Sequence, residues 1–110
     1  MKISVLKKQL TKVLEKNFNK NSIIVAYEPI WSIGTGKIPT VSELKKTTIH
    51  IKKVLKGIFK KNSPAVLYGG SVDGSNVEMF KEIREIDGFL IGGASKSSKK
   101  FIDIIKNYYR

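Results

Sequence analysis

Apolar residues along this chain follow two spacings, one typical of helices and one typical of strands. Over residues 3 to 17 they recur at helical spacing, which predicts an amphipathic helix whose apolar side carries Ile3, Leu6, Leu10, Val13 and Leu14. After a polar turn, the short run from Ile23 to Tyr27 is apolar and rich in branched residues. Such a run predicts a strand that is buried on both faces.

The same alternation continues to the end of the chain. The further elements expected are a helix from about 42 to 61 capped by Thr40 or Ser42, a strand at 65–68, a helix at about 75–85, a strand at 89–91, and a last helix carrying Phe101, Ile104, Ile105 and Tyr108. Strands that alternate with helices predict an α/β fold with a parallel sheet and right-handed crossovers.

The most informative segment begins where the first expected strand ends. There Glu28 is followed by Pro29, which fixes its own φ and pushes the preceding residue toward an extended backbone. Gly34 and Gly36 then give the loop freedom and allow bare N–H groups to approach an anion closely. A carboxylate, a loop with large apolar side chains and an anion contact within a dozen residues indicate an enzyme site.

Residues 26–37, AYEPIWSIGTGK, resemble the signature of the triosephosphate isomerase family. Two later segments, LYGGSV at 67–72 and DGFLIGGAS at 87–95, resemble the same family in order and spacing. The resemblance covers nearly all of the 110 residues but only the C-terminal part of the family's barrel, and a complete (β/α)8 barrel needs about 250 residues. We therefore expect a partial (β/α)8 barrel with about three C-terminal βα units preceded by a helix, so that residues 1–110 form one incomplete domain.

The family interconverts dihydroxyacetone phosphate and glyceraldehyde 3-phosphate by proton transfer through an enediolate, in glycolysis and gluconeogenesis. The resemblance implies that Glu28 is the catalytic base, and it implies no cofactor and no metal. It assigns the substrate phosphate to backbone N–H groups of Gly34, Ser71, Gly92 and Gly93. It assigns a closing lid and its latch to Pro29, Ile30, Trp31, Thr35, Gly36, Lys37 and Tyr68.

Two further polar residues are expected to lie outside the chemistry, and a third departs from the family's pattern. His50, the one histidine, is expected on the surface in mid-helix and is not the family's electrophilic histidine. Asn76 is expected to position the start of a helix rather than to touch substrate. Lys96 stands where the family often has an apolar residue, and nothing in the sequence explains the exchange.

Charge and composition narrow the remaining classes. The net charge of +12 is nearly all lysine, spread over expected helix faces without the aromatic-interleaved motif of a nucleic-acid module. A solvated surface therefore explains it better than nucleic-acid binding, and the field would also attract an anionic phosphate. There is no cysteine, and no apolar stretch approaches the ~20 residues of a membrane span. We expect a soluble, cytoplasmic chain with no membrane or nucleic-acid partner.

The family's catalytic lysine and electrophilic histidine both come from its N-terminal half, ahead of residue 1, and Met1 falls inside what would be its fifth helix. This favours a split or truncated reading frame, and little activity is expected from the chain alone. Two hypotheses stay open. The chain is either the C-terminal half of a homo-oligomeric isomerase that needs a separately encoded N-terminal half, or a non-catalytic remnant that serves phosphate binding or assembly. A runner-up enzyme class is another phosphate-binding (β/α)8 isomerase or synthase, which would lack the YEPIW lid.

Overall fold

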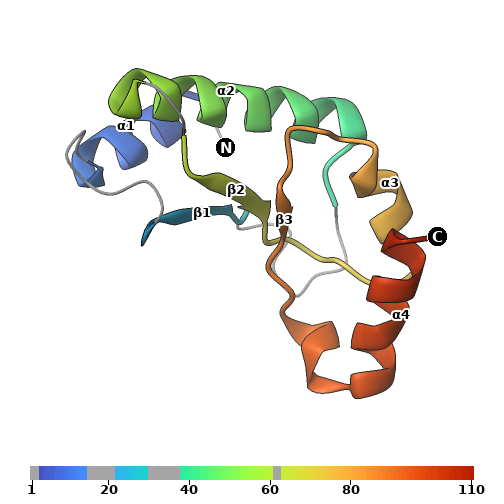
Figure 1. Ribbon diagram of the computed structural model, residues 1–110. Helices are drawn as coiled ribbons and strands as arrows, with labels where there is room; N and C mark the ends of the chain where they lie inside the picture. The colour runs from blue at the N-terminus through green and yellow to red at the C-terminus, as the bar shows by residue number, and fades with distance from the viewer. Residues whose placement is uncertain (1–2, 15–21, 30–37, 61–62) are drawn as a thin grey trace.

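The computed structural model describes residues 3–14, 22–29, 38–60 and 63–110, and these form alternating helices and strands (Figure 1). In chain order they are α1 (Ile3–Val13), β1 (Ile24–Tyr27), α2 (Val41–Phe59), β2 (Ala65–Tyr68), α3 (Val77–Lys81), β3 (Gly88–Phe89), the short 3-10 helix η3 (Gly93–Lys96) and α4 (Ser98–Tyr108). The α/β class expected from the sequence is confirmed.

The three strands form one parallel sheet in the order β1-β2-β3. Tyr27 lies opposite Tyr68, and Tyr68 lies opposite Phe89, so the carboxyl ends of all three strands meet at one edge. Hydrogen bonds continue past the strands, since the Gly69 N–H donates to the Tyr27 carbonyl at 2.8 Å and the Leu90 N–H to the Tyr68 carbonyl at 3.0 Å. The loops that leave the strands therefore start side by side.

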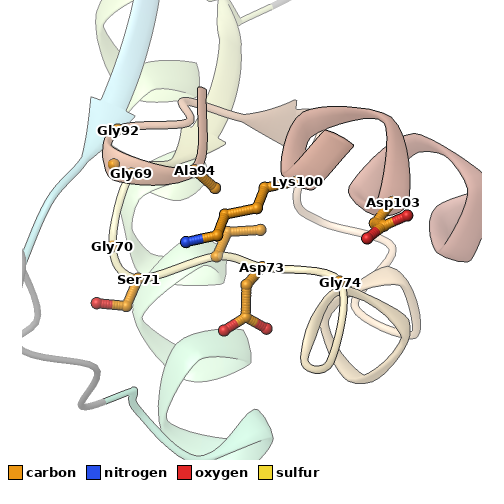
Figure 2. Close-up of a pocket in the computed structure, with 11 residues that line it drawn as sticks. Gly69, Gly70, Ser71, Asp73, Gly74, Gly92, Ala94, Lys100 and Asp103 are labelled. Carbon is orange, nitrogen blue, oxygen red and sulfur yellow. The ribbon is translucent and has the colours of Figure 1, made fainter. Parts of the chain in front are cut away.

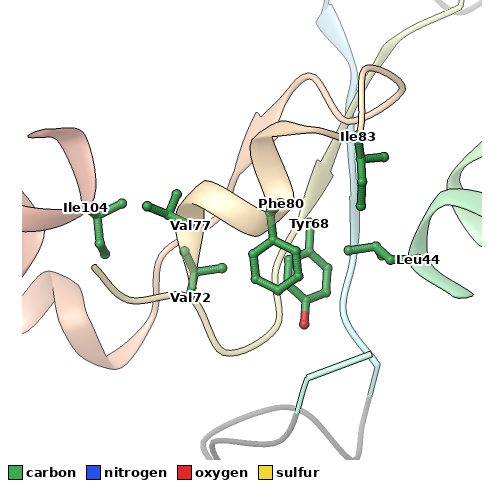
Figure 3. Close-up of a cluster of buried hydrophobic side chains, with 7 residues drawn as sticks. All are labelled: Leu44, Tyr68, Val72, Val77, Phe80, Ile83 and Ile104. Atoms are coloured by element: carbon green, nitrogen blue, oxygen red, sulfur yellow. The ribbon is translucent and has the colours of Figure 1, made fainter. Parts of the chain in front are cut away.

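Two apolar clusters join the sheet to its helices. The first links β2 to α2, α3 and α4 through Leu44, Tyr68, Val72, Val77, Phe80, Ile83 and Ile104 (Figure 3). The second links β2 to α1 and α2 through Leu6, Ile51, Leu55 and Val66. The helices α1 and α2 lie together on one side of β1 and β2 (Figure 1).

The prediction that the first strand is buried on both faces is wrong for this chain. Its residues alternate between exposed and half-buried, and Ile24 keeps 67% of its surface exposed. Burial on both faces requires a second layer against the sheet. In the described residues α1 and α2 supply only one, so Val25 and Tyr27 are packed while Ile24 and Ala26 are exposed.

Several element boundaries also differ from the sequence prediction. The first helix ends at Val13 and the second at Phe59, where Lys60 turns to φ 70° and its N–H donates to the Lys56 carbonyl. The third helix covers only Val77–Lys81, because residues 73–76 form a hydrogen-bonded turn instead. The last strand is Gly88–Phe89, since these are the residues that pair with β2.

The structure also tests two smaller predictions. Thr40, not Ser42, caps α2: its Oγ1 accepts from the Glu43 N–H at 3.1 Å and donates to Glu43 Oε1 at 2.9 Å. The surface position expected for His50 is wrong, because the residue is half-buried. Its Nε2 is buried and has no hydrogen-bond partner within the described part of the chain.

Asp87 ties the start of β2 to the rest of the sheet and to α2. Its Oδ2 accepts from the N–H of the buried residue Val66 at 2.8 Å and lies 3.1 Å from Lys52 Nζ. Its own N–H donates to the Val66 carbonyl at 2.9 Å. The N–H and the carbonyl group of Val66 therefore both hydrogen-bond to the same residue, Asp87.

We predict that Asp87→Ala lowers the free energy of unfolding by about 1–2 kcal/mol, because a buried N–H loses its acceptor. The urea midpoint of the full chain measures the change. Lys52→Met removes only the partly exposed ion pair and is expected to cost less than about 1 kcal/mol. Equal losses in the two variants would show that the ion pair, not the backbone contact, carries the stabilisation.

Candidate functional site

A cleft of about 510 Å³ opens at the carboxyl ends of β2 and β3 (Figure 2). Its walls are the loop after β2, the loop that leads into η3, and two side chains of α4. The lining residues are Gly69, Gly70, Ser71, Val72, Asp73, Gly74, Gly92, Gly93, Ala94, Lys100 and Asp103. Phosphate sites of α/β barrels commonly occur at this edge of the sheet.

The loop after β2 is held from both ends. Before it, Tyr68 is 1% exposed and its ring centroid lies 4.9 Å from that of Phe80. After it, the Asn76 side chain donates to the Ser71 carbonyl at 3.0 Å and accepts from the Asp73 N–H at 2.9 Å. Asn76 precedes α3 but makes no side-chain cap to it, so its hydrogen bonds hold the cleft loop in place.

Asp73 adds a fixed negative charge to the cleft wall. Its Oδ1 accepts from the Ser75 hydroxyl at 2.5 Å and from the N–H groups of Ser75 and Asn76 at 2.8 and 3.1 Å. The hydrogen bond from the Ser75 hydroxyl is the main reason that the pKa of Asp73 lies below its ordinary value. Asp73 is therefore an ionised carboxylate at neutral pH.

Glu28 leaves β1 beside this cleft. Its side chain lies so close to Gly69 that a Cβ added there would be 2.5 Å from Glu28 Cγ and 3.0 Å from Oε1. Only glycine allows that approach without movement of the carboxylate. Glu28 does not line the 510 Å³ cleft itself; it lines a neighbouring hollow of about 280 Å³ with residues of α1, β1 and α2. It thus lies at the boundary between the two.

The structure brings together most of the expected site residues that it describes. Ser71, Gly92 and Gly93 line one cleft, and Glu28 lies against a fourth residue of the same cleft, Gly69. The expected phosphate contact Gly34 lies outside the described residues, and so do the expected lid residues Ile30, Trp31, Thr35, Gly36 and Lys37. Pro29 is fully buried, and the latch role of Tyr68 stays a prediction.

Sequence reasoning missed the side chains that α4 contributes. Lys100 and Asp103 both line the cleft, and the Asn107 side chain donates to the Gly74 carbonyl at 2.7 Å. The signal was present, since polar residues at positions i, i+3 and i+7 share one side of a helix. This spacing is a weak indication of a site, because neighbouring lysines in the sequence make Lys100 look like one of many surface lysines.

The described residues hold neither a metal-binding cluster nor a membrane-spanning helix. These residues contain no group of three or more His, Cys, Asp or Glu side chains placed to hold a metal ion. None of their helices combines the length and apolar character that crossing a membrane requires.

A parallel sheet with alternating helices, and with glycine-rich loops that meet at the strands' carboxyl ends, is the arrangement found in one part of a (β/α)8 barrel and also in open α/β sheets. The crystal structure of triosephosphate isomerase from Bartonella henselae superposes on 98% of this chain with a TM-score of 0.84 and 30% sequence identity. The sequence profile of the family described as Triosephosphate isomerase matches residues 1–108. The chain belongs to the triosephosphate isomerase family, an isomerase family with a TIM-barrel fold.

The chain spans about a third to a little under half of the length of the relatives it matches. It is 41% identical to triosephosphate isomerase of Chlamydia abortus over 92 residues, which are 81% of this chain and 36% of that protein. It is 39% identical to the Saccharomyces cerevisiae protein of the same name over 108 residues, or 96% of this chain and 43% of that protein. In the Bartonella structure the match covers 43% of the chain.

We predict that Gly69→Ala displaces the Glu28 side chain while the fold survives, because the new Cβ would lie only 2.5 Å from Glu28 Cγ. The chemical shift of the Glu28 carboxyl carbon in the labelled chain measures the displacement. Gly93→Ala is the matched control, since no heavy atom lies within 4 Å of its added Cβ and Gly93 already has the helical backbone of η3. An unchanged Glu28 signal in Gly69→Ala would contradict the close packing of Glu28 on Gly69.

Proposed function

We propose that this chain supplies the base and most of the phosphate contacts of a triosephosphate isomerase site, which interconverts dihydroxyacetone phosphate and glyceraldehyde 3-phosphate. The observation that carries the proposal is the position of Glu28 against Gly69, beside the cleft that Ser71, Gly92 and Gly93 line. Membership in the family supports the choice of substrate.

In the proposed mechanism, Glu28 removes a proton from the carbon next to the substrate carbonyl and returns it to the former carbonyl carbon, while a proton passes between the two substrate oxygens, so that hydroxyl and carbonyl exchange places. The resulting enediolate carries developing negative charge on oxygen, which positioned donors stabilise. Backbone N–H groups of Ser71, Gly92 and Gly93, together with Gly34, hold the phosphate and so fix the reacting carbons near the carboxylate. The lid, from Pro29 and Trp31 to Lys37, excludes water when it closes and suppresses side reactions.

The proposal includes a second half of the site. The family's lysine and electrophilic histidine belong to the N-terminal part of its barrel, and the 110 residues of this chain do not contain that part. We therefore propose that the chain alone is inactive or nearly so and that activity requires the N-terminal half. The resemblance also leads us to expect a homodimer acting in cytoplasmic glycolysis.

One observation favours the alternative of a non-catalytic assembly fragment. Ile24 and Leu90 expose 67% and 46% of their surfaces, and apolar exposure of this kind favours association with another layer. The isomerase proposal explains the same exposure, since strands from an N-terminal half would cover it. The two hypotheses differ in activity after assembly, not in their need for a partner.

We predict that a chimaera restores isomerase activity, in which this chain replaces the matching C-terminal segment of the Saccharomyces relative. Glyceraldehyde 3-phosphate is the substrate of the assay, and turnover is measured from the NADH that is oxidised when the dihydroxyacetone phosphate formed is reduced. The same chimaera with Glu28→Gln, which is nearly isosteric, is expected to lose about 10²- to 10⁴-fold, because proton transfer lacks its base. The isolated chain is the second control and is expected to stay well below ~10 s⁻¹.

A folded chimaera without activity would favour the assembly fragment. Activity that survives in Glu28→Gln would remove the glutamate from the proposed role. Turnover of ~10 s⁻¹ or more in the isolated chain would contradict the need for a second half.

A further inference from the structure

The cleft that holds the expected phosphate contacts carries an excess of negative side chains. Two carboxylates, Asp73 and Asp103, line it, and Lys100 is the cationic side chain among the same lining residues. The hydrogen bonds to Asp73 keep that carboxylate ionised. A phosphate dianion in the cleft would therefore be repelled by its walls unless a positive charge balanced them.

Lys100 is positioned to supply that charge. Figure 2 shows its side chain reaching from α4 across the cleft, with the ammonium group on the side of the loop that carries Gly70 and Ser71. Within the described part of the chain, neither an ion pair nor a hydrogen bond uses this ammonium group. Lys100 is thus not committed to the neighbouring carboxylates.

The backbone of Lys100 is well fixed. Ser97 caps α4, and its hydroxyl accepts the Lys100 N–H at 3.3 Å. Further along the helix, Ile104 is 5% exposed in the core, and Asn107 donates to the Gly74 carbonyl at 2.7 Å. The helix therefore holds the base of this flexible side chain at the cleft wall.

We propose that Lys100 is a phosphate-binding residue of this cleft, whose ammonium group donates to a phosphate oxygen of the substrate and partly offsets the charge of Asp73 and Asp103. The proposal rests on the proposed function, because it assumes that the phosphate lies between Ser71 and the Gly92-Gly93 loop. Backbone N–H groups there can donate to the phosphate but carry no net charge, whereas an ammonium group adds both a charge-assisted hydrogen bond and a positive charge. Lys100 thus reduces the repulsion that the two carboxylates exert on a bound phosphate.

The test is an amide NMR titration of the full chain with inorganic phosphate and with glycerol 3-phosphate, which cannot isomerise. The amide signals of Ser71, Gly92 and Gly93 report binding at the loops. We expect Lys100→Gln to weaken binding about five- to tenfold and Lys100→Arg, which keeps the charge, to change it less than about twofold. Lys99→Gln is the matched control, since Lys99 and Lys100 are both exposed neighbours on the same helix and only Lys100 lines the cleft.

Salt dependence separates a charge contact from a structural role. Raising ionic strength from roughly 0.02 to 0.2 M is expected to weaken binding more in the unchanged chain than in Lys100→Gln, because the ammonium–phosphate attraction is screened. The unliganded amide spectra of the variants check that the fold is unaffected.

The outcomes distinguish the two proposals. If the loop amides respond to phosphate and Lys100→Gln binds as tightly as Lys99→Gln, the role of Lys100 is overturned while the phosphate site stands. If neither anion shifts the Ser71, Gly92 and Gly93 signals, the phosphate site fails and the role of Lys100 fails with it. Equal weakening in Lys99→Gln and Lys100→Gln would indicate a diffuse surface field and would also overturn the proposal.

Discussion

The parallel register of β1 and β2 is the constraint on which the rest of the site depends. It places Tyr27 opposite Tyr68, and the next residues along each strand, Glu28 and Gly69, then emerge side by side. A shift of one residue would turn the side chains of β2 to the other face and take Tyr68 out of the core, since side chains alternate along a strand. The burial of Tyr68 against Phe80 therefore fixes which residue faces Glu28.

That register also explains why glycine follows the strand. Any larger residue at position 69 would meet the Glu28 side chain at 2.5 Å, so the sheet and the carboxylate both limit the loop's first residue. Aromatic packing extends the same support outward: the ring of Phe89 in β3 lies 6.1 Å from Phe80 and 5.9 Å from Tyr108 in α4. The second loop and the helix that lines the cleft are thereby joined to the same core.

Much of this arrangement could be predicted from the sequence, because helical and strand spacing depends on local residue order. The glycine loops at 69–71 and 92–93 carry a family signature that identified them as cleft residues. Burial of the first strand on both faces could not be predicted correctly, because the residues of β1 suit a complete barrel, in which both faces are covered. Ile24 is apolar for a layer that the described residues do not contain. The contribution of α4 was missed because solvent-facing and cleft-facing lysines look alike in a sequence, and only the helix's position separates Lys100 from Lys99.

The proposed site combines two kinds of phosphate contact, backbone donors and a charged side chain, which place different requirements on the sequence. The proposed backbone donors at Ser71, Gly92 and Gly93 depend on the path of the loop after each strand. Small residues allow that path without placing a side chain in the cleft. Side-chain charge is less constrained, because a long lysine reaches the same space from several positions on a nearby helix. Asp73 is committed to its own turn through three hydrogen bonds, so its charge is tied to the structure of the loop. If an anion binds beside this turn, as proposed, the carboxylate there would repel it, and Lys100 of α4 is the cationic side chain among the residues that line the cleft.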